Sequence, residues 1–488
     1  MTQSPPASSE PAASVVPPVV LDAANLSFAQ LPLAPSTLAN LQQLGYLQMT
    51  PIQAASLPLA LAGHDLIAQA KTGSGKTAAF ALSLLAKLNP RRFAVQALVL
   101  CPTRELADQV TQEIRRLARG EDNIKVLTLC GGSTMRPQIS SLEHGAHVVV
   151  GTPGRIMDHL QRESLDLSAL DTLVLDEADR MLDMGFFDDI VFVAKACPKA
   201  RQTLLFSATY PEGIGKLSQQ FLRQPQRITL PEQHEAGKIR QRFYEVDSAQ
   251  RLSAVGLLLK HYRPVSTLAF CNTRQQCRDL LQLLRAEGFV ALALHGELEQ
   301  RERDQVLIQF ANRSCSVLVA TDVAARGLDI DQLEAVINVD ITPDSEIHVH
   351  RIGRTGRVDQ DGWAFSLVSS NQKGRVANIV KTMGVDVEWR SLNDLQIPVD
   401  ADKPLMPPMV TLLILGGRKE KIRPGDVLGA LTGEAGFSKE QVGKINVTDT
   451  STYVAVLRSI AKDALRKLTA GTIKGKKVKV HLLSDRGG

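Results

Sequence analysis

The chain has 488 residues, of which 44% are hydrophobic and 22% are charged, and its formal net charge is +5. This composition is ordinary for globular proteins, and the length suffices for two to four domains. No run of eighteen apolar residues occurs, so the sequence predicts no membrane-spanning helix.

The N-terminal segment, residues 1–24, is rich in Ala, Pro and Ser and has no basic region before an apolar core. These properties predict a disordered leader and argue against a signal peptide. Six cysteines are scattered through the rest of the chain without a Cys-x-x-Cys pair, at positions 101, 130, 197, 271, 277 and 315. Their spacing indicates reduced thiols in the cytoplasm and no zinc site.

Residues 25–232 are predicted to form a first α/β domain, because short apolar runs alternate there with helical patterns. The runs are residues 65–69, 97–100, 147–150, 172–175 and 203–206. Continuous apolar strands separated by helices indicate a parallel sheet that helices cover on both faces.

A phosphate-binding loop is predicted at residues 70–77, between a strand and a helix. It reads Ala70-Lys71-Thr72-Gly73-Ser74-Gly75-Lys76-Thr77. Gly73 and Gly75 let backbone N–H groups surround phosphates at the start of the helix. Lys76 can reach the β- and γ-phosphates, and the Thr77 hydroxyl can ligate Mg²⁺. A Gly-Ser surface turn is the alternative, which the strand–loop–helix context disfavours.

Two acids directly follow the apolar run at residues 172–175, in the sequence Asp176-Glu177-Ala178-Asp179. Acids at the carboxyl end of a buried parallel strand can hold Mg²⁺ and the attacking water of a nucleotide hydrolase. Alone, the tetrapeptide would more often be a turn or a helix cap. Together with the phosphate loop it predicts an ATP site, in which Asp176 ligates Mg²⁺ and Glu177 orients or deprotonates the water.

The alternation restarts after a linker predicted at residues 233–240, so residues 241–396 are predicted to form a second α/β domain. Its apolar runs are residues 267–270, 290–294, 317–320 and 335–339. This domain has no phosphate loop of its own. A Pro-rich linker is predicted at residues 397–408.

Residues 409–484 are predicted to form a small basic domain with the order βαββαβ, the split arrangement of ferredoxin-like folds. The strands are expected near 410–414, 442–447, 453–457 and 478–483, and the helices near 424–431 and 460–468. From Met409 onward the chain has 15 Lys and Arg and 7 Asp and Glu, which gives this part a net charge of +8. The preceding residues have a net charge of −3. This asymmetry indicates a polyanionic partner; a solvated Lys-rich tail is the alternative.

Taken in chain order, these motifs resemble the DEAD-box RNA helicases over residues 25–398. The resemblance implies an α/β fold of two tandem RecA-like parallel-sheet domains, followed by an RRM-like α+β domain. It identifies Thr50-Pro51-Ile52-Gln53 as an adenine-reading motif and Phe28 as a residue that stacks on adenine. The Gln53 amide can both donate to and accept from adenine, which excludes guanine. The other ATP-binding residues it implies are Ala70, Lys71, Thr72, Gly73, Ser74, Gly75, Lys76, Thr77 and, on the ribose, Asp329.

The same resemblance assigns RNA contacts, coupling residues and arginine fingers. RNA contacts are implied for Pro102, Thr103, Arg104, Gly132, Thr152, Pro153, Gly154 and Arg155 in the first domain, and for Asn272 and Thr273 in the second. Coupling of RNA to nucleotide is implied for Ser207, Thr209, Asp322, Arg326 and His350. Arg354 and Arg357 are implied to reach the γ-phosphate, and such fingers contribute about 10³–10⁵ in rate. The catalytic set is then Lys76, Asp176, Glu177, Arg354 and Arg357.

The basic C-terminal domain resembles the RNA-binding domain of the DbpA subgroup of DEAD-box proteins. An RRM usually stacks bases on aromatic side chains of its central strands, but here Tyr453 stands alone. We therefore expect RNA contacts from basic side chains, those of Arg418, Lys419, Lys421, Lys474, Lys476 and Lys477. The resemblance implies a hairpin of 23S ribosomal RNA and pre-50S particles as partners.

The expected activity is that of an ATP-dependent RNA helicase in the cytoplasm, with no membrane partner. ATP and Mg²⁺ would be its cofactors, RNA would stimulate ATP hydrolysis, and duplexes would be unwound locally during large-subunit assembly. Three alternatives stay open. They are an ATP-gated RNA clamp that does not unwind, an RNA helicase without ribosomal specificity, and a DNA helicase of related two-domain design.

Overall fold

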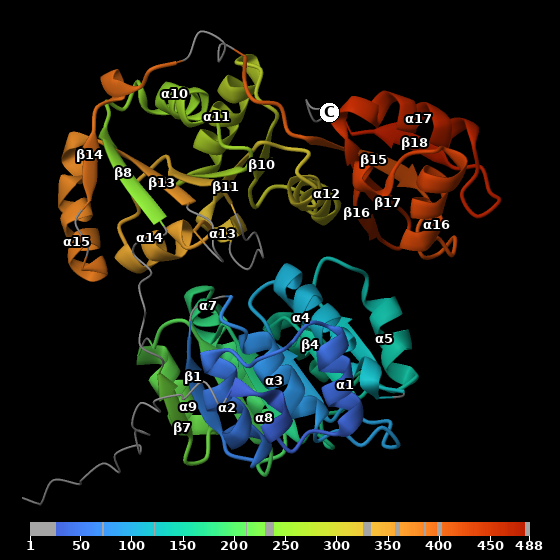
Figure 1. Cartoon of the computed structure of the whole chain (residues 1–488). Helices are drawn as coiled ribbons and strands as arrows, with labels where there is room; N and C mark the ends of the chain where they lie inside the picture. Colours follow the sequence, from blue (N-terminus) through green and yellow to red (C-terminus); the bar gives the residue numbers. More distant parts are fainter. Residues whose placement is uncertain are drawn as a thin grey trace, which may run out of the picture. The chain divides into compact units, whose positions relative to one another are not determined.

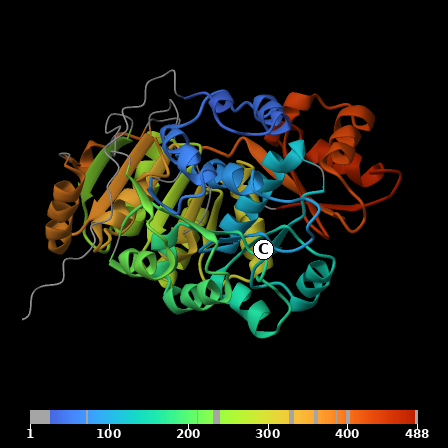
Figure 2. The ribbon, with the colours of Figure 1, turned by 90° about the horizontal axis from the view of Figure 1, so that it is seen from below.

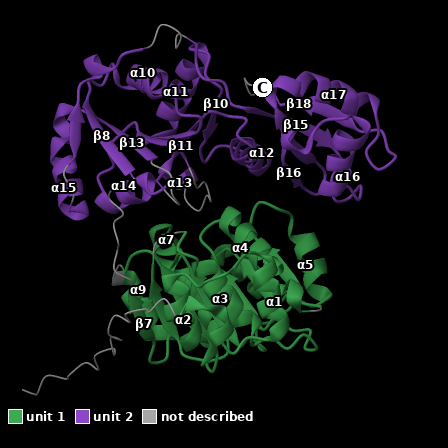
Figure 3. Cartoon of the chain, in the orientation of Figure 1, with its two compact units in different colours: residues 1–233, 327–329 green, residues 234–326, 330–488 purple. Residues whose placement is uncertain are grey.

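A computed structural model describes most of the chain, namely residues 26–70, 73–121, 123–210, 212–229, 239–325, 333–356, 362–384, 387–397 and 403–483. The chain divides into two units, one of residues 1–233 and 327–329 and one of residues 234–326 and 330–488 (Figure 3). The second unit holds the second predicted α/β domain together with the basic C-terminal domain. No helix in the described part of the chain combines the length and the apolar character that a membrane crossing needs.

The first unit is built on a seven-stranded parallel sheet with the order β3-β4-β2-β5-β6-β1-β7 (Figure 1). Its strands are β1 (Leu66–Gln69), β2 (Ala97–Leu100), β3 (Val126–Leu129), β4 (Val148–Gly151), β5 (Thr172–Asp176), β6 (Gln202–Ser207) and β7 (Gln226–Thr229). β2, β4, β5 and β6 are buried along their whole length, as expected when helices cover both faces. Every strand predicted from an apolar run is present, with its ends within one residue.

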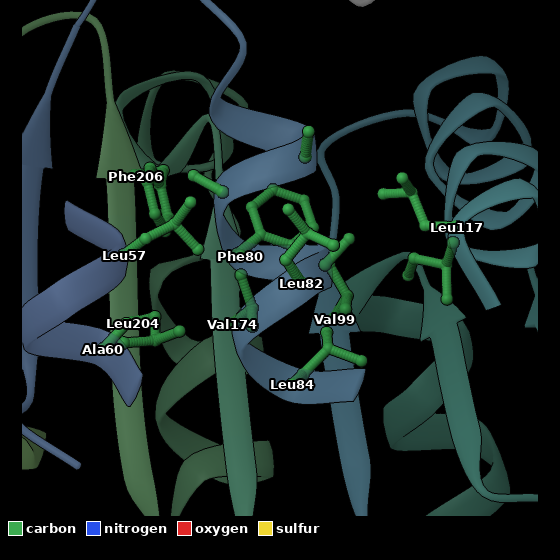
Figure 4. Close-up of a cluster of buried hydrophobic side chains, with 14 of the residues drawn as sticks. Leu57, Ala60, Phe80, Leu82, Leu84, Val99, Leu117, Val174, Leu204 and Phe206 are labelled. Atoms are coloured by element: carbon green, nitrogen blue, oxygen red, sulfur yellow. The ribbon is translucent and has the colours of Figure 1, made fainter. Parts of the chain in front are cut away.

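Helices pack on both faces of this sheet and form two apolar clusters with it. The helices are α1 (Pro35–Gln43), α2 (Pro51–Leu61), α3 (Lys76–Leu85), α4 (Arg104–Leu117), α5 (Met135–Glu143), α6 (Pro153–Gln161), α7 (Ala178–Asp183), α8 (Phe187–Ala196) and α9 (Glu212–Phe221), with short 3₁₀ turns at Phe28–Gln30 and Ala118–Gly120. Alternate residues of β2 enter different clusters: Val99 packs in the cluster of α3, and Leu98 in that of α8. Figure 4 shows the α3 cluster, with Phe80, Leu82 and Leu84 over the strand residues Val99, Val174, Leu204 and Phe206.

The α/β domain of the second unit is also a seven-stranded parallel sheet, with the order β10-β11-β9-β12-β13-β8-β14 (Figures 1 and 2). Its strands are β8 (Ile239–Glu245), β9 (Thr267–Cys271), β10 (Ala291–Leu294), β11 (Val317–Thr321), β12 (Ala335–Asn338), β13 (Gly362–Val368) and β14 (Glu388–Arg390). When the strands of each domain are numbered from its own first strand, the two orders are identical. The prediction of two tandem RecA-like sheets is therefore confirmed.

The helices of this domain are α10 (Arg251–Tyr262), α11 (Arg274–Ala286), α12 (Gln300–Ala311), α13 (Asp322–Ala325), α14 (Ser345–Ile352) and α15 (Lys373–Met383), with 3₁₀ turns at Ser370–Gln372 and Leu392–Asp394. β8 begins at Ile239, inside the stretch 233–240 that the sequence predicts as a linker. The domain boundaries stay predictions in other respects, because the described contacts join this domain and the C-terminal domain in one unit.

The C-terminal domain is a four-stranded antiparallel sheet with the order β16-β17-β15-β18, packed on helices. Its elements are β15 (Met409–Leu415), α16 (Pro424–Gly429), a π-helical turn (Ala430–Glu434), a 3₁₀ turn (Lys439–Gln441), β16 (Val442–Val447), β17 (Thr452–Leu457), a 3₁₀ turn (Arg458–Ile460), α17 (Ala461–Ala470) and β18 (Lys479–Leu482). Leu412 and Val454 of the central strands pack with Leu468 of α17, so the helices cover one face. The predicted βαββαβ order is confirmed.

The other face of this small sheet packs against the α/β domain of the same unit. Thr411 of β15 is fully buried, and its hydroxyl is hydrogen-bonded to Asn312 Nδ2 at 3.2 Å and to Ser314 Oγ at 2.6 Å. Tyr453 of β17 is 4% exposed, and this burial raises the pKa of its hydroxyl, while Arg301 of α12 opposes the shift. Tyr453 is therefore too buried in this structure to stack on an RNA base.

The six cysteines are free and buried in the described part of the chain, where none of them forms a disulfide. Burial raises the pKa of the Cys130 thiol to about 12 and that of Cys197 to about 11. Thiols with such pKa values are poorly reactive, as expected of structural cysteines.

His348 of α14 is a fully buried histidine outside the predicted site. Its ring lies 6.0 Å from the ring of Phe243, and neither ring nitrogen has a hydrogen-bond partner among the described residues. Burial, reinforced by the charge of Arg351, lowers the pKa of His348 from 6.5 to about 4. The folded chain therefore holds this imidazole neutral.

We expect acid to destabilise the chain through His348. Below pH 6.5 the unfolded chain binds a proton at this histidine, and the folded chain does not until the pH nears 4. The contribution of neutral His348 to the free energy of unfolding is thus fully present above pH 6.5 and is lost as the pH falls toward 4. The free energy of unfolding should be about 2 kcal/mol lower at pH 5 through this histidine. Urea unfolding at pH 7.5 and pH 5 measures the loss. His348→Leu should remove it, the exposed control His481→Leu should keep it, and equal losses in all three proteins would refute the assignment.

Candidate functional site

Apart from Phe28 and residues 50–53, which precede β1, the predicted motifs of the first unit follow the carboxyl ends of its parallel strands. The loops after β3, β4 and β2 lie on one half of the sheet and carry Gly132, Arg155 and Arg104. The loops after β5, β6 and β1 lie on the other half and include Asp176 and Lys76. Ligands of open parallel sheets bind at this edge. The sheet order thus places the predicted RNA and ATP residues side by side on one surface.

The phosphate loop has a backbone that allows close approach to a ligand. Gly73 and Gly75 have φ values of +80° and +93°, which residues with side chains rarely adopt. A Cβ atom on Gly75 would lie 2.5 Å from Gln53 Nε2, so a side chain there would displace Gln53. Gly75 also caps α3, so that the helix N-terminus faces the loop. Lys71 and Thr72 lie outside the described residues.

Lys76 opens α3 as a buried cation. Its side chain is 5% exposed, and its Nζ has no hydrogen-bond partner among the described residues. Its charge acts on Asp176 and Asp179 nearby. A buried ammonium without hydrogen bonds is costly, so this group fits a site that an anionic ligand completes. Thr77 follows it on the helix and is partly exposed.

Gln53 connects the predicted adenine-reading motif to the phosphate loop. Its side chain accepts a hydrogen bond from the Thr50 N–H at 2.9 Å and donates to the Gly75 carbonyl at 3.1 Å. These two bonds hold the amide in one orientation. Phe28 is 4% exposed, and its ring packs edge-on against Tyr46 with the centroids 6.3 Å apart. Stacking of Phe28 on adenine stays a prediction.

Asp176 and Glu177 lie at the tip of β5 and are both buried. Burial raises the pKa of Asp176 to about 7; Lys76 opposes the shift and Glu177 adds to it. A bound divalent cation would favour the ionised carboxylate, so Asp176 fits the predicted role of a Mg²⁺ ligand. Glu177 has a left-handed backbone with φ of +52° and caps α7. Non-glycine residues in this conformation cluster at functional sites.

Asp179 ties α7 to the segment Ser207-Ala208-Thr209 that follows β6. Its carboxylate accepts hydrogen bonds from the Ala208 N–H at 3.1 Å and from the N–H and hydroxyl of Thr209 at 2.8 and 3.0 Å. The Ser207 hydroxyl accepts from the Asp179 N–H at 3.3 Å. Although burial alone would raise it, the pKa of Asp179 lies below its usual value because Thr209 stabilises the carboxylate. The predicted coupling residues Ser207 and Thr209 thus contact the acidic motif directly.

The loops predicted to contact RNA touch one another. The Arg104 guanidinium lies against the backbone of Gly132, where an added Cβ would come within 1.5 Å of it. Arg155 donates to the Ser133 carbonyl at 3.2 Å. The other predicted residues of these loops are Pro102, Thr103, Thr152, Pro153 and Gly154, at or next to the starts of α4 and α6. Guanidinium groups gathered beside an exposed glycine backbone are suited to phosphate contacts.

In the second unit, a buried arginine joins two of the predicted site residues. Arg351 of α14 is 2% exposed and donates to both carboxylate oxygens of Asp322, each at 2.6 Å. It also donates to Asn272 Oδ1 at 3.1 Å and to the Asp340 carbonyl at 2.7 Å. The segments after β9, β11 and β12 therefore meet at this one guanidinium.

Arg351 has no assigned role in the sequence-based prediction. The sequence signal is its place in a run with three arginines, at 351, 354 and 357. Its contacts with residues 29 and 79 positions earlier become visible only when the sheet order is known.

The structure describes the other predicted residues of this domain in part. Thr273 caps α11 by accepting from the Gln276 N–H, and His350 is half-buried on α14. Arg354 is 6% exposed, next to the turn that ends α14. The remaining predicted residues, Arg326, Asp329 and Arg357, lie outside the described residues.

The basic side chains predicted to contact RNA in the C-terminal domain lie on two adjacent turns. All are exposed: Arg418, Lys419, Lys421, Lys474, Lys476 and Lys477. Lys474 Nζ donates to the Lys421 carbonyl at 3.0 Å, which joins the turn after β15 to the turn before β18. Both residues have left-handed backbones, with φ of +54° and +63°. The two turns thus form one positively charged surface.

Known protein families match three successive parts of the chain. Residues 50–217 match the DEAD/DEAH box helicase family, residues 250–359 match the helicase conserved C-terminal domain, and residues 411–482 match the DbpA RNA binding domain. The three matches follow the order of the domains described above.

Individual proteins are similar over most of the chain. The ATP-dependent RNA helicase DbpA of Escherichia coli strain K12 is 51% identical over 454 residues, which cover 92% of this chain and 98% of the relative. The DEAD-box ATP-dependent RNA helicase CshA of Bacillus cereus is 42% identical over 357 residues, 73% of this chain and 68% of the relative. A solved structure of S. cerevisiae Dbp5 bound to RNA and ADP BeF3 is 31% identical, covers 75% of this chain and 96% of its own, and superposes with a TM-score of 0.70.

Proposed function

The chain belongs to the DbpA subgroup of the DEAD-box ATP-dependent RNA helicases, and on this premise we propose that it remodels 23S ribosomal RNA in pre-50S particles. ATP hydrolysis drives local unwinding, and the C-terminal domain selects the RNA. The six buried thiols support a reducing compartment, the cytoplasm.

The observation that carries the ATP site is the buried ammonium of Lys76 without a hydrogen-bond partner among the described residues. The phosphates of ATP supply that partner, and the backbone of Gly73 and Gly75 surrounds them. Thr77 and Asp176 would hold Mg²⁺, which would neutralise charge on the phosphates.

Three side chains complete the reaction in this proposal. Glu177 orients the attacking water and accepts its proton. Arg354 and Arg357 of the second unit stabilise the charge that develops on the γ-phosphate. Because these groups come from two units, we expect hydrolysis to be fast only when both ATP and RNA are bound. RNA therefore stimulates hydrolysis.

The RNA residues are divided between the helicase domains and the C-terminal domain. The loops at Gly132, Arg104 and Arg155 hold the backbone of the strand to be separated. The basic surface on the two turns holds a ribosomal hairpin, and this tether raises the concentration of neighbouring duplexes at the helicase domains. A base-pair step is worth about 1.4 kcal/mol, so each cycle melts a few pairs.

We expect ATP hydrolysis to respond to RNA, and most strongly to a 23S fragment that contains the target hairpin. Phosphate release is measured with this fragment, with an unrelated RNA hairpin of equal length and with a DNA of the same sequence. The 23S fragment should activate at a concentration at least about tenfold lower than the unrelated RNA, since tethering favours the specific complex. Equal stimulation by DNA would favour a DNA helicase, and hydrolysis without strand separation would favour an RNA clamp.

A charge-reversal pair tests the basic surface without altering the fold. Lys419→Glu/Lys477→Glu should abolish the preference for the 23S fragment, because two exposed cations of the surface are reversed. Lys439→Glu/Lys462→Glu makes the same change in net charge at exposed sites elsewhere on the domain and should keep the preference. Deletion at Pro408 is a poorer test, because it removes Thr411 and uncovers Asn312 and Ser314.

A further inference from the structure

Arg180 of α7 contacts the residue proposed to activate water. Its Nη1 lies 3.1 Å from Glu177 Oε2, and the two side chains are 9% and 7% exposed. Ion pairs of this kind are often seen on helix surfaces, where they contribute little. This pair is buried, so loss of either charge removes a favourable contact in a poorly solvated place.

The backbone brings these two side chains together at the start of a short helix. Glu177 is the cap of α7, with φ of +52°, and Arg180 lies one turn further along. The intervening Asp179 binds Ser207, Ala208 and Thr209, which anchors the first turn of α7 to the end of β6. The guanidinium of Arg180 is thus carried by a fixed turn.

The charges around Glu177 show why a cation is needed there. Asp176, Glu177 and Asp179 are three buried acids within four residues. Lys76 acts on Asp176 and Asp179. Arg180 is a cation in contact with Glu177. Arg180 thus opposes the repulsion that the neighbouring acids exert on the Glu177 carboxylate.

We propose that Arg180 is a positioning residue, which holds the Glu177 carboxylate in the place from which it acts on the attacking water. The proposal rests on the proposed function, in which Glu177 accepts the proton of that water. Arg180 itself touches neither nucleotide nor water in this role. A small displacement of a catalytic group can slow a reaction by about 10²-fold, so the effect should be on turnover and not on ATP binding.

The test is a double-mutant cycle of Arg180→Gln and Glu177→Gln in the full chain, read by RNA-stimulated phosphate release in multiple and single turnover. Arg180→Gln should lower kcat about 10- to 100-fold with the KM for ATP within about twofold of wild type. In the Glu177→Gln background the same change should lower the residual rate less than about twofold, because its target is already absent. Arg180→Lys should recover part of kcat, because it keeps the charge.

A matched control separates positioning from loss of a helical ion pair. Arg116 pairs with Glu113 at 3.4 Å in α4 of the same unit, with the same three-residue spacing. Arg116→Gln should leave kcat unchanged. If Arg180→Gln does not fold, the cycle is run with Arg180→Lys, which should then lower kcat in the wild-type background alone.

Three results would overturn the proposal: wild-type kcat in Arg180→Gln, an equal loss of rate in both backgrounds, or a loss confined to the KM for ATP. The single variant Glu177→Gln separates this failure from failure of the proposed function. If Glu177→Gln hydrolyses ATP normally, the assignment of the base is wrong. If it does not and the cycle is additive, the role of Arg180 alone is wrong.

Discussion

Glu177→Gln is expected to slow RNA-stimulated ATP hydrolysis by about 10²–10⁴-fold, the usual range for loss of a general base. The amide keeps the size of the side chain but cannot accept a proton. ATP should still bind, because Lys76 and the phosphate loop are unchanged. Single-turnover phosphate release measures the chemical step, and titration calorimetry with a non-hydrolysable ATP analogue measures binding.

Glu163 offers a control for this substitution within the same unit. It is also a glutamate with a left-handed backbone, with φ of +56°, but it is exposed and follows α6. Glu163→Gln should hydrolyse ATP at the wild-type rate. A wild-type rate in Glu177→Gln with saturating RNA would instead remove Glu177 from the mechanism.

Arg351→Gln is expected to destabilise the second unit by about 3–5 kcal/mol, which is the usual cost of removing one partner of a buried ion pair. The substitution leaves the Asp322 carboxylate without the two 2.6 Å hydrogen bonds that now satisfy it. It also releases Asn272, so RNA-stimulated hydrolysis should fall together with stability. Chemical denaturation, followed by a probe in the second unit, gives the free energy of unfolding.

Two further variants make this measurement specific. Arg351→Met/Asp322→Leu removes both charges and should destabilise less than Arg351→Gln alone, because no charge is left unpaired. Arg466→Gln breaks an exposed ion pair with Asp463 in the same unit and should leave the unfolding midpoint unchanged. A small effect of Arg351→Gln, similar to that of Arg466→Gln, would show that the buried network is not important for stability.

Apolar runs predicted five strands of the first sheet and four of the second, including the edge strand β10, but they missed β3, β7, β8, β13 and β14. β2 and β5 are buried on both faces, so each is a continuous apolar run. The edge strand β7 is half-buried and β14 is exposed along its length, and their sequences carry no such run. Burial on both faces makes a strand recognisable, as in the edge strand β10, and an exposed strand lacks that constraint.

The site shows a similar division between what a motif predicts and what the fold adds. Local sequence predicted the phosphate loop and the acids after β5, because each motif is a strand end followed by a turn and a helix. Parallel strand order then brings Arg104 to Gly132. The contacts of Arg351 depend on which strands are neighbours, and those of Arg180 depend on the left-handed turn at Glu177. Neither property is visible as a sequence pattern.

The contact of Thr411 in the C-terminal domain with Asn312 and Ser314 of the α/β domain has a consequence for the design of chimeric helicases. A domain that is grafted onto a different helicase is usually cut at its own first and last strands. Here the cut would leave Thr411, on one face of the transferred sheet, without its hydrogen-bond partners Asn312 and Ser314. The segment that must be transferred is therefore larger than the C-terminal domain. A working chimera would need residues 312–316 in addition to residues 409–483.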